Sequence, residues 1–208
     1  MKKFSKRILT TTFIILGLMM ADQKLQAQTN YKLAQGKDVT IKVLGSSNVH
    51  DWEMASAVME SQGEFVINAE HQLTALPAFN LALDAKSLKS EHQTMDERTY
   101  KTMKADQYPK IVYKLASAAI TELEKGKYTI KTTGKLTIAG VTQTINMVVN
   151  ATVNADNTIT CTGAEPLKLT DYKIDPPSFM LGAMKVKNDL TIQFNLVYKS
   201  NQLTTKVN

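Results

Sequence analysis

Residues 46–56, SSNVHDWEMAS, contain the side-chain types that a serine hydrolase uses. A serine hydroxyl becomes a nucleophile when a histidine ring accepts its proton and a carboxylate orients that ring. Two serines, His50 and Asp51 supply these groups within a few residues, next to Trp52, the only tryptophan of the chain. The stretch therefore raises two hypotheses, a catalytic site and the start of a β-strand.

The geometry of a strand argues against the catalytic hypothesis. Successive side chains of an extended chain point to opposite faces, so His50 shares a face with Trp52 and not with Asp51. Neither a Gly-x-Ser-x-Gly elbow nor a glycine-rich oxyanion loop accompanies the stretch. We therefore predict no catalytic residue and no enzyme activity, and a hydrolase or metal enzyme centred on His50 is the weakest of our hypotheses.

The three histidines are the next candidates for chemistry, as metal ligands. His50, His71 and His92 lie far apart in the sequence, whereas typical zinc motifs place two ligands a few residues apart on one element. Scattered histidines are ordinary in a protein of this length. We predict no metal site and no other cofactor.

The first 27 residues have the composition of a secretory leader. A basic segment containing Lys2, Lys3, Lys6 and Arg7 precedes a largely apolar run of thirteen residues, 8–20, which is too short to span a bilayer. Ala27 offers a small residue for cleavage. The sequence predicts a signal peptide over 1–27 and a periplasmic or secreted domain over 28–208; an uncleaved N-terminal anchor is the alternative.

Without that leader the chain is almost neutral. It retains 20 basic and 18 acidic residues, a net charge of +2, and Arg98 is its only arginine. This balance gives no support for a nucleic-acid partner. Cys161 is the sole cysteine and cannot form a disulfide within the chain, so stability must come from the core.

Alternation of apolar and polar residues dominates the rest of the sequence and indicates strands with one buried face. The alternating segments are 39–43, 79–83, 111–115, 128–130, 145–153 and 190–198. The stretches EKGKY and NADNT, between such segments, predict hairpin turns. We expect one all-β domain of about eight or more strands, closed as a barrel or packed as a sandwich.

One segment, about 94–107, lacks alternation and predicts a short helix. Met95, Thr99, Tyr100 and Met103 recur at helical spacing. Thr94 and Glu97 match a capping box at the start, and Pro109 ends the segment.

The run DYKIDPPSFMLGAMKVKNDLTI, residues 171–192, predicts a loop across an open end of the fold. Pro176 and Pro177 cannot continue a strand ladder, and Gly182 permits a bend before the last strand. The apolar residues between them are Phe179, Met180 and Leu181. We expect these three to plug an end of the core or to face a ligand.

Four motifs in a fixed order resemble the YceI-like proteins: HDW, then MDERTYKTMKADQYPKIVYK, GKLTIAGVTQTINMVV and IDPPSFMLGAMKVKNDLTIQF. The resemblance covers about 39–198. The family's acidic helix ending in an aromatic-proline pair is matched by Asp96 and by Tyr108-Pro109. Its G-x-L-T-x-x-G-V-T hairpin is matched by Gly134, Leu136, Thr137, Gly140, Val141 and Thr142. The chain departs from the family in having Met95 where many relatives have arginine, and in its two prolines near the end.

The resemblance implies an exported protein with an antiparallel, lipocalin-like β-barrel that binds a long isoprenoid or other amphiphilic lipid. No catalysis is known for that fold. Strand parity and side-chain size suggest ligand-lining residues at Trp52, Phe79, Leu81, Tyr113, Met147 and Phe179. The alternative is a stress-associated interaction module with a filled core and a membrane redox protein as partner. A homodimer also remains open.

Overall fold

The computed structural model describes residues 29–36 and 38–201, so the predicted leader and its cleavage point lie outside the described residues. Within that part the chain is mostly strand, with one α-helix, α2 (Gln93–Thr102), and two 3₁₀ turns, η1 (Ala85–Ser87) and η2 (Leu169–Tyr172). The strands are β1 (Thr29–Leu33), β2 (Thr40–Ser47), β3 (Asp51–Ser56), β4 (Met59–Ile67), β5 (Leu73–Ala75), β6 (Phe79–Asp84), β7 (Lys110–Glu124), β8 (Lys127–Ile138), β9 (Val141–Val153), β10 (Ile159–Lys168), β11 (Ser178–Phe179) and β12 (Met184–Ser200). No helix in the described ranges is both long and apolar enough to cross a membrane.

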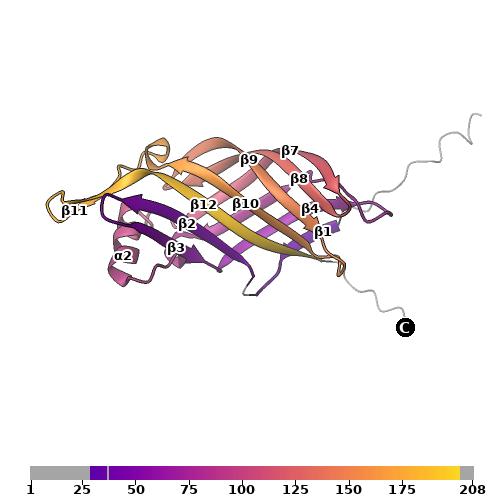
Figure 1. The fold of residues 1–208 in the computed structure, drawn as a ribbon, viewed down its shortest axis with the longest axis horizontal. Helices are drawn as coiled ribbons and strands as arrows, with labels where there is room; N and C mark the ends of the chain where they lie inside the picture. The colour runs from indigo at the N-terminus through magenta and orange to yellow at the C-terminus, as the bar shows by residue number, and fades with distance from the viewer. Residues whose placement is uncertain (1–28, 37, 202–208) are drawn as a thin grey trace, which may run out of the picture.

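Eight antiparallel strands close into a barrel (Figure 1). Their order is β1-β4-β6-β7-β8-β9-β10-β12, and β1 pairs with β12 to complete the ring. The long hairpins β7–β8 and β8–β9 turn at Gly126 and Gly140, both at positive φ. This closure decides between the two architectures that alternation allows, and it confirms the predicted barrel.

The hairpin of β2 and β3 extends the wall at one end. The same edge of β12 pairs with β1 near Tyr198 and with β2 between Asn195 and Val186. The outer edge of β3 is covered in turn, because Ala55 exchanges backbone hydrogen bonds of 2.7 and 2.8 Å with Lys89. The hairpin therefore extends the wall at the end at which α2 lies, whereas β9 and β10 pair only between 149–153 and 159–163 and separate toward that end.

Aromatic rings close the other end of the barrel. Phe65 lies 5.4 Å from Tyr31 and 5.3 Å from Tyr198 between ring centroids, and Phe79 lies 5.7 Å from Tyr198. Tyr198 is wholly buried, and its hydroxyl lies 2.8 Å from that of Ser61. The Phe65–Tyr31 and Phe79–Tyr198 pairs pack edge to face, which adds to the free energy of burial.

The helix begins one residue earlier than predicted and lacks the predicted capping box. His92 is the N-cap residue and makes no side-chain cap hydrogen bond, so the prediction from Thr94 and Glu97 is wrong. Hydrogen-bonded turns continue from Met103 to Gln107, and Pro109 precedes β7 as expected. The helix lies across one end of the barrel (Figure 1).

Candidate functional site

Two adjoining cavities occupy the barrel interior. The outer cavity, about 290 Å³, lies beneath α2, and the inner cavity, about 120 Å³, ends against Phe65 and Phe79. Four side chains belong to the walls of both cavities: Val43, Leu88, Ile111 and Ile192. The two cavities therefore adjoin along the barrel, the outer one toward α2 and the inner one toward the aromatic cluster, and we call them together the lumen.

The six residues predicted to line a ligand all belong to the walls of this lumen. Trp52 and Phe179 line the outer cavity. The inner cavity is lined by Phe79, Leu81, Tyr113 and Met147. Parity placed them on the inner face because side chains alternate along a strand. Their contact with a ligand stays a prediction.

Glycines in the wall let large rings lie flat against it. The ring of Trp52 covers Gly45, its cross-strand partner, so closely that a β-carbon on the glycine would lie 2.1 Å from Cζ2. Tyr113 covers Gly134 in the same way, at 2.4 Å. Phe194 on Gly163 and Phe79 on Gly63 repeat the arrangement. Because the rings lie against the wall, they leave more of the space along the barrel axis free for the lumen.

The polar side chains between β2 and β3 stabilise the turn itself and do not form a catalytic triad. The Ser47 hydroxyl donates to the His50 carbonyl oxygen at 3.0 Å and accepts from the backbone N–H groups of Val49 and His50 at 3.1 Å. The ring Nδ1–H of His50 donates to the backbone carbonyl oxygen of Asp51 at 2.9 Å. The strand begins at Asp51, later than HDW suggested, yet His50 and Trp52 both line the outer cavity as the parity argument expected.

A cation–π contact joins the two elements that flank the mouth of the lumen. The guanidinium carbon of Arg98, on α2, lies 4.4 Å from the centroid of the Phe179 ring, on β11. Both residues line the outer cavity. A contact of this type at an exposed site contributes about 0.5–1 kcal/mol. It therefore stabilises the approach of α2 to β11 only weakly.

A buried carboxylate fixes α2 to the loop that precedes it. Asp96 accepts hydrogen bonds from the backbone N–H and the hydroxyl of Ser90 at 2.7 and 2.8 Å, and Lys89 lies 3.5 Å away. Burial alone would raise the pKa of Asp96, but these partners outweigh it and lower the pKa. The Tyr100 hydroxyl donates to the carbonyl oxygen of Leu88 at 2.6 Å. These bonds position the helix over the lumen.

Two buried polar atoms in residues that line the outer cavity have no hydrogen-bond partner within the described part of the chain, Trp52 Nε1 and Tyr172 Oη. Burial, with smaller contributions from Asp171 and Glu165, raises the pKa of Tyr172 to about 12, so its hydroxyl stays protonated. Both groups are therefore available hydrogen-bond donors.

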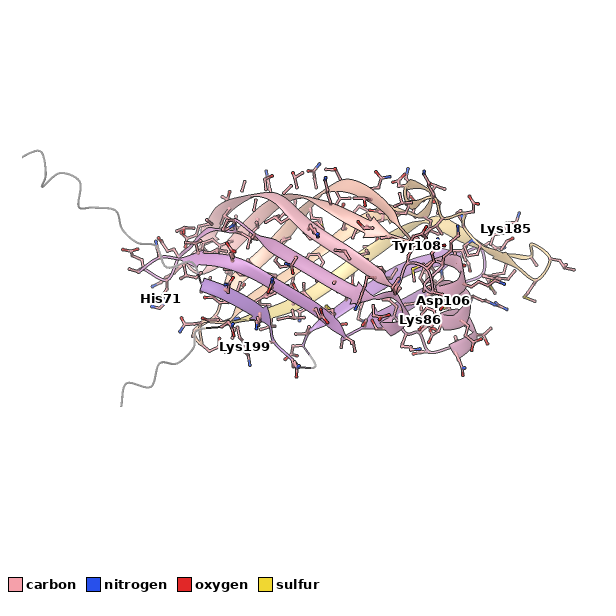
Figure 2. All side chains as sticks on the ribbon, turned by 180° about the vertical axis from the view of Figure 1, so that it is seen from behind. His71, Lys86, Asp106, Tyr108, Lys185 and Lys199 are labelled. Atoms are coloured by element: carbon pink, nitrogen blue, oxygen red, sulfur yellow. The ribbon has the colours of Figure 1, made fainter. Side chains whose placement is uncertain are left out.

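The inner cavity contains the one cysteine of the sequence. Cys161 faces inward from β10, and burial raises the pKa of its thiol to about 12. Across residues 29–36 and 38–201, no three His, Cys, Asp or Glu side chains gather as a potential metal site. His50 and His92 border the outer cavity, whereas His71 lies at the opposite end of the barrel (Figure 2).

Several residues of the site were not found from the sequence. Arg98 and Thr102 line the outer cavity with Met95, at the spacing of one helical face, and that spacing was the available signal. Tyr172 had no such signal, because it lies in the 3₁₀ turn η2. Met180 and Leu181 are exposed, so the expectation that they plug the core was wrong, and neither belongs to the walls of the two cavities.

Comparison with known proteins gives a consistent result. Residues 29–198 match the family described as the YceI-like domain. BcnA from Burkholderia cenocepacia is 20% identical, with a TM-score of 0.64, and the match covers 79% of this chain and 98% of that protein. A polyisoprenoid binding domain from Saccharophagus degradans is 13% identical, with a TM-score of 0.62 and coverage of 83% and 99%. No curated protein matches the sequence.

The structural likenesses, at these identities, show a shared barrel fold. The family match extends over most of the chain and includes every strand of the closed barrel. The chain belongs to the YceI-like family.

Proposed function

We propose that this protein binds a long isoprenoid or another slender amphiphilic lipid in the barrel lumen, as an exported protein of the periplasm or the cell exterior. The observation that carries the proposal is the narrow apolar lumen, about 290 Å³ outside and 120 Å³ inside, closed at one end. These volumes fall at or below the low end for ligand cavities, which favours a chain over a bulky ring system.

Burial of hydrocarbon supplies the driving force. Each methylene moved from water into the lumen contributes about 0.8 kcal/mol, so a long tail needs no charged anchor, although ordering the ligand offsets much of the sum. The relative from Saccharophagus degradans is described as a polyisoprenoid binding domain, and its barrel resembles this one. The open lumen differs from the filled interior that the interaction-module hypothesis assumes.

The polar end of the ligand has candidate partners in Trp52 and Tyr172. Their buried N–H and O–H groups lack acceptors in the described structure, and an unsatisfied buried donor costs about 1–3 kcal/mol. A ligand oxygen near the outer cavity would satisfy them. The proposal includes no catalytic step, because the Ser47 hydroxyl is already engaged within its turn.

Native mass spectrometry of protein purified from its own host tests this function. We expect a copurifying lipid that is released on unfolding, and uptake of a labelled isoprenoid by the emptied protein. An empty barrel that also fails to take up labelled isoprenoids would overturn the proposal. Sequencing of the mature N-terminus tests the predicted cleavage after Ala27 separately.

A further inference from the structure

Exposed apolar side chains gather at the mouth end of the barrel. Six large apolar side chains are exposed in the described part of the chain, and three of them, Val49, Met180 and Leu181, belong to the two turns at this end. Leu181 is fully exposed and Met180 is 72% exposed. In Figure 1 the loop beyond β11 projects past the barrel at the end where α2 lies. We call Val49, Met180 and Leu181 the tip.

The backbone holds the tip outward at an energetic cost. Met180 and Leu181 have φ of 53° and 52°, in the left-handed region, before Gly182 at 89°. Such a conformation is unfavourable for a residue other than glycine, because the β-carbon crowds the following carbonyl oxygen. The strain and the exposed apolar surface both oppose folding, so a contact outside the chain is the simplest compensation for them.

Hydrogen bonds join the two turns into one unit. The side-chain amide of Asn48 donates to the Ala183 carbonyl oxygen at 2.8 Å, and its own oxygen accepts from the Lys185 N–H at 2.7 Å. The backbone N–H of Asn48 donates to the Lys185 carbonyl oxygen at 3.0 Å. The tip therefore keeps a fixed position relative to the barrel.

The tip adjoins the mouth of the lumen and has a basic flank. Phe179, Met184 and Val186, on either side of the loop, line the outer cavity. Residues 176–187 include two exposed lysines, Lys185 and Lys187, and the nearest carboxylates along the chain are Asp175 and Asp189. Apolar side chains flanked by lysines complement a bilayer that contains anionic lipid.

We propose that the tip docks this end of the barrel onto an anionic lipid bilayer, with Met180 and Leu181 inserted among the head groups and the lysines against the lipid charge. The mouth then faces the membrane, and an insoluble chain can enter the lumen without crossing water. That entry route rests on the proposed function, whereas the docking does not.

Flotation with vesicles tests the docking. Vesicles of phosphatidylcholine with phosphatidylglycerol should bind the wild type, and the double variant Met180→Ser, Leu181→Ser should bind about tenfold or more weakly. Lys185→Gln with Lys187→Gln should remove most of the salt dependence. Leu123→Ser is the control, because Leu123 is an exposed leucine, 66% exposed, in the β7–β8 hairpin, beside the Gln72 loop at the other end. It should bind as the wild type does.

A second measurement separates this proposal from the proposed function. Uptake of a labelled isoprenoid from a soluble cyclodextrin complex bypasses the membrane, and the tip variants should match the wild type there. A wild type that does not float with these vesicles, or tip variants that float as well as the wild type, would overturn the docking. Loss of cyclodextrin uptake by the wild type would instead overturn the proposed function and leave the flotation result to stand.

Discussion

The ring of Tyr108 lies directly over Gly140, so that a β-carbon on the glycine would come within 2.4 Å of ring Cε1. Tyr108 ends the segment that follows α2, and Gly140 forms the β8–β9 turn at φ 78°. Two family motifs that are separate in the sequence therefore meet in one contact. Figure 2 shows Tyr108 at the end of the barrel that α2 covers.

Substitution of Gly140 by alanine is expected to destabilise the fold by about 2–4 kcal/mol, because strain at positive φ and the collision with Tyr108 add together. Gly182→Ala is the matched control, since its φ is 89° but no atom lies within 4 Å of the new β-carbon. Urea unfolding should show the smaller loss, about 1 kcal/mol, for Gly182→Ala. Equal losses would show that the Tyr108 contact adds nothing.

Met147→Trp is expected to block ligand uptake. Residue 147 lines the inner cavity, so the indole would fill space that the lipid needs, at a stability cost of about 1–3 kcal/mol. Val148→Trp is the control, because Val148 is the next residue on β9 and points outward. Titration with a labelled isoprenoid should show at least about a tenfold loss of affinity for the first variant only. Unchanged binding by Met147→Trp would place the ligand elsewhere.

Asp96 is expected to make stability depend on acid pH. Its pKa in the folded protein lies below the ordinary value of 3.8, so the unfolded chain binds the proton first and the carboxylate stabilises the fold above that value. The stabilisation is lost as the pH falls below about 3.8 through the lowered pKa. In urea unfolding, the difference between the wild type and Asp96→Asn should be full at pH 6 and shrink at pH 3.

Asp106→Asn serves as the control for this pH series. Asp106 lies 2.6 Å from Lys86, but both side chains are largely exposed (Figure 2), and such pairs contribute little. A difference for Asp96→Asn that stays constant between pH 6 and pH 3 would contradict the role given to its charge.

Removal of the Ser61 hydroxyl is expected to destabilise the fold more than removal of the Tyr198 hydroxyl. Ser61 donates its hydroxyl proton to the Asn80 carbonyl oxygen at 2.7 Å, so Tyr198 must donate to Ser61. Ser61→Ala strands a fully buried phenol, at about 1–3 kcal/mol, whereas Tyr198→Phe loses one bond worth about 1 kcal/mol. Thermal unfolding should rank Ser61→Ala as the less stable variant, and the reverse order would contradict this donor assignment.

The sequence contained enough information for six of the strands and for their inner faces, but β1, β4 and β10 were not among the alternating segments. Residues 145–153 alternate because one face of β9 is buried, and this pattern is local. The helix boundary was predicted less well, because Asp96 bonds to Ser90 outside the helix and the Thr94–Glu97 pattern makes no cap. A capping motif read from the sequence does not show whether the side chains at the helix start will bond within the helix or to a residue outside it.

The lumen itself depended on information that is not local. That Trp52 lies flat on Gly45 follows from the register of β2 and β3, and the Arg98 contact with Phe179 follows from how α2 and β11 meet. Neither register nor docking angle can be read from periodicity, which also left barrel and sandwich unresolved. The six predicted lining residues were therefore predictable by face, whereas Tyr172 and the contacts between the site residues were not.

The inward position of Cys161 makes the rate of its modification a measure of access to the inner cavity. A thiol whose pKa is raised to about 12 is almost wholly protonated at neutral pH, and only the thiolate reacts with alkylating reagents. Modification therefore requires that water and reagent reach the inner cavity, either along the lumen or through a local opening of the strands. A chain bound in the lumen would block the first route, and we expect it to slow the labelling of the unaltered protein.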